Sequence, residues 1–198
     1  MTPREGRTGP APANAKPVIP SGAIARVRRT RRRALAESVL GVDPGLNRTG
    51  YAVVEVRTGR LLDAGLIRST VRASLAARLA EIGAGIEEIF AEHCVGGLVV
   101  EDLFAHYRHP RTAILMGHAR GVVLLAAARH GVEVSSVSAT RIKKVLTGHG
   151  HASKVQVQRA IMAAYGLREI PEPADVADAL AAAYYAVSAS SRCSQEAS

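Results

Sequence analysis

Hydrophobic residues in the first part of the patterned chain fall into short runs typical of β-strands. The first run covers residues 38–43 (SVLGVD) and ends in a carboxylate. A second covers residues 51–56, and the turn Arg57-Thr58-Gly59 leads into a third near residues 61–67. Apolar, β-branched runs separated by a Gly-containing turn favour antiparallel pairing. The pattern predicts three consecutive strands that form a meander.

The rest of the chain alternates between the helical and the strand period. Leu75, Leu79, Ile82 and later isoleucines recur at three- and four-residue steps, which is typical of an amphipathic helix. Three meandering strands followed by alternating units predict an α/β domain with a mixed five-stranded sheet and helices on both faces. The remaining predicted elements are a strand at 97–100, a helix from Pro110 to about 129, a strand at 132–137, a helix from the capping box Ser153/Gln156 to about 165, and a last helix from near Pro173.

Charge and proline separate residues 1–37 from the patterned part. The chain carries a net charge of +9, and this segment alone has nine lysines and arginines against Glu5 and Glu37. It also has five of the nine prolines. Such a segment buries too little apolar surface to offset its ordering entropy. We expect a disordered basic tail at 1–37, a folded domain at 38–190 and a disordered C-terminal tail at 191–198.

Cysteine usage and hydropathy indicate a cellular compartment. Cys94 and Cys193 have no metal-ligand spacing, as in a reduced cytosolic protein. The sequence has no apolar run of membrane-spanning length and no apolar stretch of a signal peptide near its start. The expectation is a cytoplasmic protein.

Two carboxylates end predicted strands. Asp43 and Glu101 follow apolar runs directly, and the carboxyl ends of strands are where ligands bind in open α/β sheets. Each also has a structural interpretation. Asp43 in Asp-Pro-Gly is a common turn residue, and Glu101 could simply cap its strand.

The last predicted helix favours a metal site. It is apolar nearly all round, which is typical of a buried helix, yet it carries Asp175 and Asp178 near its start. Burying an unpaired carboxylate is costly, whereas Mg²⁺ prefers carboxylate oxygens. Together with the strand ends, these residues predict a site for two Mg²⁺ ions of the kind used in phosphodiester cleavage.

A basic segment precedes this helix. Its cations bracket residues 148–151, a glycine-rich loop that could approach a DNA backbone, although surface lysines beside a flexible loop are the alternative. His149 and His151 lack the further Cys or His residues of a recognisable zinc set. The predicted DNA-contacting cations are Arg111, Arg141, Lys143, Lys144 and Lys154.

Five motifs in order resemble the RuvC family of Holliday junction resolvases, over roughly residues 39–187. They are Gly41-Val42-Asp43-Pro44-Gly45 with Thr49-Gly50-Tyr51, Val100-Glu101-Asp102-Leu103-Phe104, Gly117-His118-Ala119-Arg120-Gly121, Lys143-Lys144 with Gly148-x-Gly150-x-x-x-Lys154, and Asp175-Val176-Ala177-Asp178-Ala179-Leu180. The N-terminal extension departs from the family, whose members usually begin almost at the first strand.

The resemblance implies a ribonuclease H-like fold and a homodimer that makes paired symmetric nicks in Holliday junction DNA, leaving 5′-phosphates. It implies that a branch-migration complex of RuvA and RuvB type is a partner. It also places Lys143 and Lys154 near the cut, and Phe104 on a base at the junction, although Phe104 could equally be a core residue. By the same resemblance, two Mg²⁺ ions per subunit, with Mn²⁺ able to substitute, are held by Asp43, Glu101, Asp175 and Asp178.

The predicted long helix carries small residues at four-residue steps, Ala113, Gly117 and Gly121. They let another backbone approach closely, either the chain's own sheet or a second subunit across a two-fold axis. A four-way junction has two equivalent strands, which matches an isologous dimer.

Three other functions are compatible with parts of this pattern. Asp-x-Gly followed by Thr-Gly also resembles the phosphate loop of sugar kinases and actin-like proteins, but those need a second such domain. A junction-binding module without catalysis would not need all four carboxylates. A ribonuclease H-like nuclease acting on RNA–DNA hybrids is the nearest alternative.

Overall fold

The computed structural model describes residues 38–103 and 110–196 of the chain. Five strands form one sheet in the order β3-β2-β1-β4-β5. The pairs β1–β2 and β2–β3 are antiparallel, whereas β1–β4 and β4–β5 are parallel. The predicted mixed five-stranded sheet is confirmed. The strands are β1 (Ser38–Asp43), β2 (Arg48–Glu55), β3 (Leu61–Arg68), β4 (Val95–Glu101) and β5 (Glu133–Val137).

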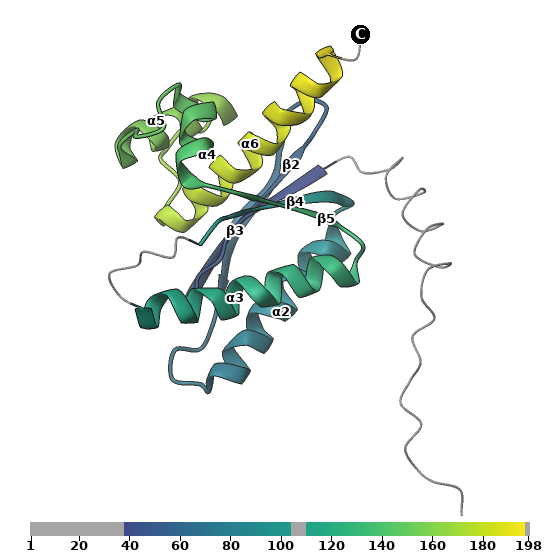
Figure 1. Cartoon of the computed structure of the whole chain (residues 1–198), viewed down its shortest axis with the longest axis vertical. Coiled ribbons are helices and arrows are strands. Elements are labelled where there is room, and N and C mark those ends of the chain that lie inside the picture. Colours follow the sequence, from purple (N-terminus) through teal and green to yellow (C-terminus); the bar gives the residue numbers. More distant parts are fainter. Residues whose placement is uncertain (1–37, 104–109, 197–198) are drawn as a thin grey trace, which may run out of the picture.

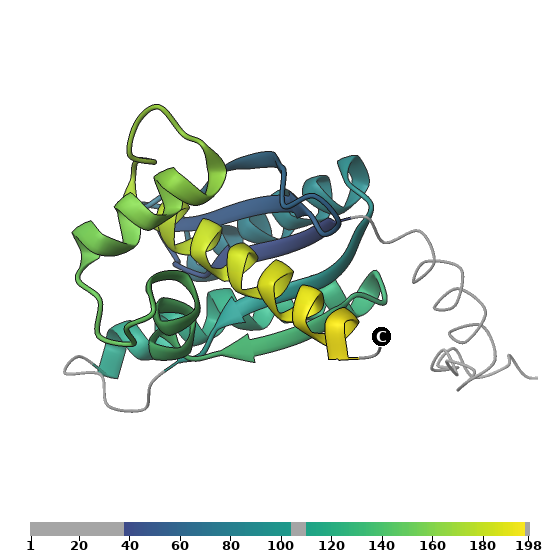
Figure 2. The same ribbon diagram turned by 90° about the horizontal axis from the view of Figure 1, so that it is seen from above.

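Helices cover both faces of this sheet, as Figures 1 and 2 show. Two helices pack on one face, α2 (Leu75–Glu92) and α3 (Pro110–Arg129). The other face carries α4 (Ala139–Thr147), α5 (Lys154–Tyr165) and α6 (Ala174–Glu196), of which α6 runs along the strands and contacts β1 and β2. The two faces have separate hydrophobic cores.

The core under α2 and α3 consists of large aliphatic side chains. Ile82, Ile86 and Phe90 of α2 are fully or almost fully buried against Leu40 and Val42 of β1. Ser74 caps α2, because its side chain accepts a hydrogen bond from the Ala77 N–H. The predicted helical period of this segment is confirmed.

The core under α6 consists largely of small residues. A Cβ added at Gly41 would lie 2.3 Å from the carbonyl oxygen of Ala179 and 2.5 Å from the backbone nitrogen of Ala183. A Cβ at Gly50 would lie 2.0 Å from the carbonyl oxygen of Asp175. Glycines on β1 and β2 therefore let the backbone of α6 lie directly against the strands.

Two segments differ from the prediction. Residues 139–147 form α4, a helix that the sequence pattern did not predict. Ser138 caps its start, and Gly148 ends it in the left-handed conformation. The C-terminal helix continues to Glu196, six residues into the segment expected to be a disordered tail; residues 188–196 contain no Gly or Pro to end it. The predicted basic tail at 1–37 lies outside the described residues. No helix in the described ranges has the length and apolar character that a membrane span requires.

Candidate active site

Strand pairing brings Asp43 and Glu101 to the same edge of the sheet. β1 and β4 are parallel neighbours in which Val42 pairs with Val100, so the next residue of each strand is a carboxylate. Both strands end at these residues. Both residues therefore lie at the ends of neighbouring strands, and their role as metal ligands remains a prediction.

The start of α6 lies over this edge. Gly50 of β2 pairs with Asp43 across the antiparallel ladder and contacts the backbone of Asp175. Asp175 is in the first turn of α6, and Asp178 follows three residues later. The close approach that Gly41 and Gly50 permit is therefore what carries both aspartates to the ends of β1 and β4.

The electrostatic environment shows that the four carboxylates interact. The pKa of Asp43 is raised to about 7, first because burial removes water from the carboxylate and then because Asp178, Glu101 and Asp175 repel its negative charge. Like charges that cannot all ionise in one place are typical of sites that hold a cation or share a proton. Asp43 is at the centre of this group.

Two lysines partly offset the charge. Desolvation and Asp178 raise the pKa of Glu101, while Lys143 lowers it. Desolvation raises the pKa of Asp178 as well, although this residue keeps contact with solvent, and Lys154 opposes the rise. Lys143, Lys154 and Asp178 line one hollow of about 190 Å³. The structure thus brings two of the predicted cations to the carboxylates.

Asp175 has an oxygen that suits a further ligand. Its Oδ2 atom is buried and lies 3.3 Å from Arg48 Nε, but it accepts no hydrogen bond there. A buried carboxylate oxygen without a hydrogen bond is costly, and a hard cation would satisfy it. The donor set of four carboxylates fits Mg²⁺ or Mn²⁺.

A tighter group of ligand atoms lies elsewhere. Within residues 38–103 and 110–196, Asp63, Glu92 and His93 have donor atoms that are all within 4.8 Å of one another. The four carboxylates at the strand ends do not form such a compact group there. The His93 Nε2 atom lies 3.4 Å from Asp63 Oδ2, so a direct contact between these two side chains explains why they lie close together.

The remaining predicted residues are less informative. Arg141 places its guanidinium 5.7 Å from the ring centroid of Tyr185 on α6. Lys144 and Arg111 are exposed, on α4 and α3. Phe104 lies outside the described residues. DNA contact by these residues remains a prediction.

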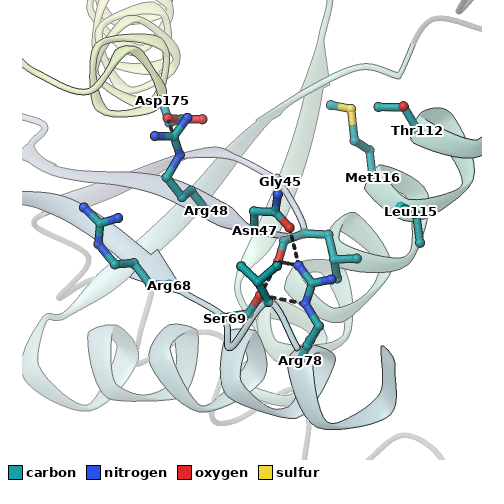
Figure 3. Close-up of a pocket in the computed structure, with 12 residues that line it drawn as sticks. Gly45, Asn47, Arg48, Arg68, Ser69, Arg78, Thr112, Leu115, Met116 and Asp175 are labelled. Carbon is teal, nitrogen blue, oxygen red and sulfur yellow. Dashed lines mark hydrogen bonds and ion pairs between the residues drawn. The ribbon is translucent and has the colours of Figure 1, made fainter. Parts of the chain in front are cut away.

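Sequence reasoning missed a cationic hollow on the other side of Asp175 (Figure 3). It has a volume of about 590 Å³, and its lining includes Arg48 at the start of β2, Arg68 at the end of β3 and Arg78 on α2. An available signal was Arg48 itself, a charged residue between the Asp43-Pro44-Gly45 turn and Thr49-Gly50. Arg68 and Arg78 gave no comparable signal, since each is separated from the motifs in sequence.

Comparison with known proteins agrees with this geometry. Residues 39–185 match the family model described as crossover junction endodeoxyribonuclease RuvC. The protein of that name from Rhodopirellula baltica is 53% identical over 154 residues, which cover 77% of this chain and 86% of the relative. The one from Heliobacterium modesticaldum is 43% identical over 147 residues, 73% of this chain and 90% of the relative.

Solved structures support the same conclusion. T. thermophilus RuvC in complex with Holliday junction substrate superposes with a TM-score of 0.73 at 34% identity, covering 77% of this chain and 94% of that one. The yeast mitochondrial Holliday junction resolvase, at 12% identity and a TM-score of 0.52, shares the fold. The fold is ribonuclease H-like, and the chain belongs to the RuvC family of crossover junction endodeoxyribonucleases.

Proposed function

We propose that this chain is a metal-dependent endonuclease that resolves Holliday junctions by paired symmetric nicks leaving 5′-phosphates. The observation that carries the proposal is the gathering of four carboxylates at one edge of the sheet, where burial first, and then repulsion by Asp178, Glu101 and Asp175, raises the pKa of Asp43 to about 7. A cluster of this charge is unfavourable alone and becomes favourable around divalent cations. The proposed substrate, Holliday junction DNA, is inferred from the names of the relatives and of the solved structure.

Each carboxylate has a proposed role as a metal ligand. Asp43 and Glu101 on rigid strands, with Asp175 and Asp178 on α6, would hold two Mg²⁺ ions, for which Mn²⁺ can substitute. Bound ions of this kind activate a water and stabilise the leaving oxygen of a phosphodiester. Lys143 and Lys154, beside Asp178 and Glu101, would bind the phosphate on which that charge develops.

The test replaces the central ligand by a neutral residue of the same shape. Asp43→Asn is expected to retain binding to a synthetic four-way junction and to lose Mg²⁺-dependent nicking by about 10²- to 10³-fold, since loss of one electrostatically stabilising group typically costs that much. Asp63→Asn is the matched control, because Asp63 lies on β3 in a separate group with His93. Nicking by Asp43→Asn at the wild-type rate would remove this site from the reaction.

Substrate choice needs its own comparison. Cleavage rates on a four-way junction and on an RNA–DNA hybrid duplex, with the same enzyme and Mg²⁺, separate a junction resolvase from a hybrid-cleaving nuclease of the same fold. Faster cleavage of the hybrid would contradict the proposal.

A homodimer through α3 is part of the proposal. Ile114 and Leu125 of α3 are 61% and 51% exposed, and they share one helical face with the exposed Gly121, whose added Cβ would meet nothing within 4 Å. Exposed aliphatic side chains around a glycine suit a second helix. Leu125→Asp, measured by light scattering, is expected to yield monomers. We further propose a cytoplasmic location and docking to a branch-migration complex of RuvA and RuvB type.

A further inference from the structure

The cationic hollow beside Asp175 lies between three parts of the fold (Figure 3). One wall is formed by the β1–β2 loop and by Arg48 at the start of β2, and another by the end of β3 with Arg68. The opposite wall is the start of α3, where Thr112, Leu115 and Met116 line the space. Asp175 belongs to both this hollow and the carboxylate group, so the hollow borders that group.

Two arginines of this hollow occupy directly opposed positions in the sheet. Arg48 begins β2 and Arg68 ends β3, and the two are cross-strand partners in the antiparallel ladder. Like charges directly opposite one another destabilise a sheet. Both side chains are exposed. An anion bound between them would turn this unfavourable pair into a favourable one.

The three arginines differ in what they already bind. Arg78 donates hydrogen bonds from Nε to Ser69 Oγ at 3.1 Å and from Nη2 to the Leu46 carbonyl at 3.2 Å, and it also contacts Asn47. Its guanidinium therefore fastens the β1–β2 loop to the end of β3. Arg78 is a structural residue of this hollow.

Arg48 and Arg68 remain for a ligand. Arg48 has one carboxylate partner, Asp175, without a hydrogen bond to its Oδ2 atom. Arg68 makes no side-chain hydrogen bond or ion pair within residues 38–103 and 110–196. A metal ion bound by Asp175 would neutralise the charge that Arg48 now contacts. Both Arg48 and Arg68 would then be available to bind an anion.

The opposite wall is apolar. Leu115 and Met116 of α3 lie across the hollow from the arginines, and Val71, which is 67% exposed, also lines it. Arginines on one side and aliphatic side chains on the other match a nucleic-acid strand, which has charged phosphates on one side and less polar sugars or bases on the other. Free phosphate would use only the cationic side.

We propose that this hollow holds the cleaved DNA strand next to the scissile phosphate, with Arg48 and Arg68 each contacting one backbone phosphate and α3 contacting the sugars or bases. This inference rests on the proposed nuclease function. It places the strand across the carboxylates, from the Lys143–Lys154 hollow on one side of α6 to the Arg48–Arg68 hollow on the other. Arg48 and Arg68 are positioning residues, which fix the register of the strand at the cut.

The experiment uses the full chain and a synthetic four-way junction. Arg68→Gln is compared with Arg57→Gln, which removes the same charge from an exposed arginine in the turn that follows β2 at its other end. Binding is measured by fluorescence anisotropy in EDTA at several salt concentrations. Arg68→Gln is expected to weaken binding by about 3- to 10-fold and to lower the slope of log K against log salt by about 1, while Arg57→Gln leaves both unchanged. Arg48→Gln is expected to weaken binding in EDTA less than Arg68→Gln, because Asp175 shares its charge.

Phosphate scanning gives a second readout. One neutral methylphosphonate is placed in turn at each position within four nucleotides of the cut, on both sides. At one of these positions the substitution is expected to weaken binding by the wild type but not by Arg68→Gln. Arg68→Lys keeps the charge and is expected to retain the salt slope, which separates a charge effect from misfolding.

The outcomes separate this inference from the proposed function. A wild-type chain that does not nick the junction contradicts the proposed function itself. A wild-type chain that nicks it, with Arg68→Gln and Arg57→Gln identical in salt slope and in the methylphosphonate scan, overturns the Arg48–Arg68 strand site alone.

Discussion

The two faces of the sheet are packed in different ways. Under α2 and α3, large side chains such as Ile82, Ile86 and Phe90 fill the space between helix and strands. Under α6, the strands carry Gly41 and Gly50 and the helix carries a run of buried alanines, among them Ala179 and Ala183. One face places side chains between the layers, whereas the other brings backbones together.

The difference follows from what each face positions. The α2–α3 face holds no proposed metal ligand, and its burial chiefly stabilises the domain. The α6 face must bring Asp175 and Asp178 to the strand ends that hold Asp43 and Glu101. Small residues fix that distance by backbone contact, which varies less than contact through long side chains. Perturbing the two faces should therefore separate stability from activity.

Among changes to the packing of the two faces, the largest effect is expected at Gly41. Gly41→Ala puts a Cβ 2.3 Å from the Ala179 carbonyl and 2.5 Å from the Ala183 nitrogen, both backbone atoms, so α6 must move away from β1. Displacement of about 1 Å can cost around 100-fold in rate, and overpacking costs about 1–3 kcal/mol in stability. We expect the rate of junction nicking to fall by at least about 100-fold. Gly97→Ala on β4 is the control, since its Cβ would make only an ordinary 3.8 Å contact with Val39.

On the other face, Ile86→Ala should lower stability and leave junction nicking nearly unchanged. It removes a fully buried side chain and is expected to cost about 2–5 kcal/mol in the free energy of unfolding. Well below the lowered melting temperature, nicking should stay within about twofold of the wild type. Denaturant unfolding and single-turnover nicking measure the two quantities. A loss of nicking as large as that of Gly41→Ala would show that the faces are not separable.

The carboxylates make stability depend on pH and metal. The Asp43 pKa is about 7 in the folded chain against an ordinary 3.8, so the folded state binds more protons between these values. Stability conferred by the protonated carboxyl is therefore lost as pH rises from about 4 to about 7, by on the order of 4 kcal/mol. Mg²⁺ binds the ionised form, so it should raise the melting temperature more at pH 8 than at pH 5. Asp43→Asn should reduce that difference, and equal Mg²⁺ shifts at both pH values in the wild type would contradict the account.

Helix caps give the smallest effects. Ser74 caps α2 and Ser153 caps α5, the latter with a full capping box with Gln156. Replacing either by Ala should cost about 1 kcal/mol in stability. Only Ser153→Ala should also weaken junction binding, because Lys154 begins the helix that it caps. Thermal unfolding with anisotropy binding distinguishes the two, and equal binding by both variants would exclude a role for this helix start in DNA contact.

The sequence was sufficient for the elements whose pattern is local. Periodicity located α2, and the apolar runs that end in Asp43 and Glu101 identified the strand ends that meet at the site. The α4 helix was missed, because its amphipathic pattern is short and polar residues Arg141, Lys143 and Lys144 dominate it. Its cap at Ser138 was the overlooked signal.

Long-range juxtapositions could not be read in the same way. The contact of Gly50 with Asp175 joins residues 125 positions apart, and the type of neither residue indicates that the other is its neighbour. The opposition of Arg48 and Arg68 depends on strand register, which includes an irregularity between Val53 and Val54. Such features follow from the packing of α6 and from the ladder, not from local propensity.

The most direct test of the central claim is anomalous diffraction from crystals of the full chain soaked in Mn²⁺. We expect Mn²⁺ peaks between Asp43, Glu101, Asp175 and Asp178, with Arg48 displaced from Asp175. Mn²⁺ bound only at Asp63, Glu92 and His93, with no peak among the four carboxylates, would contradict it.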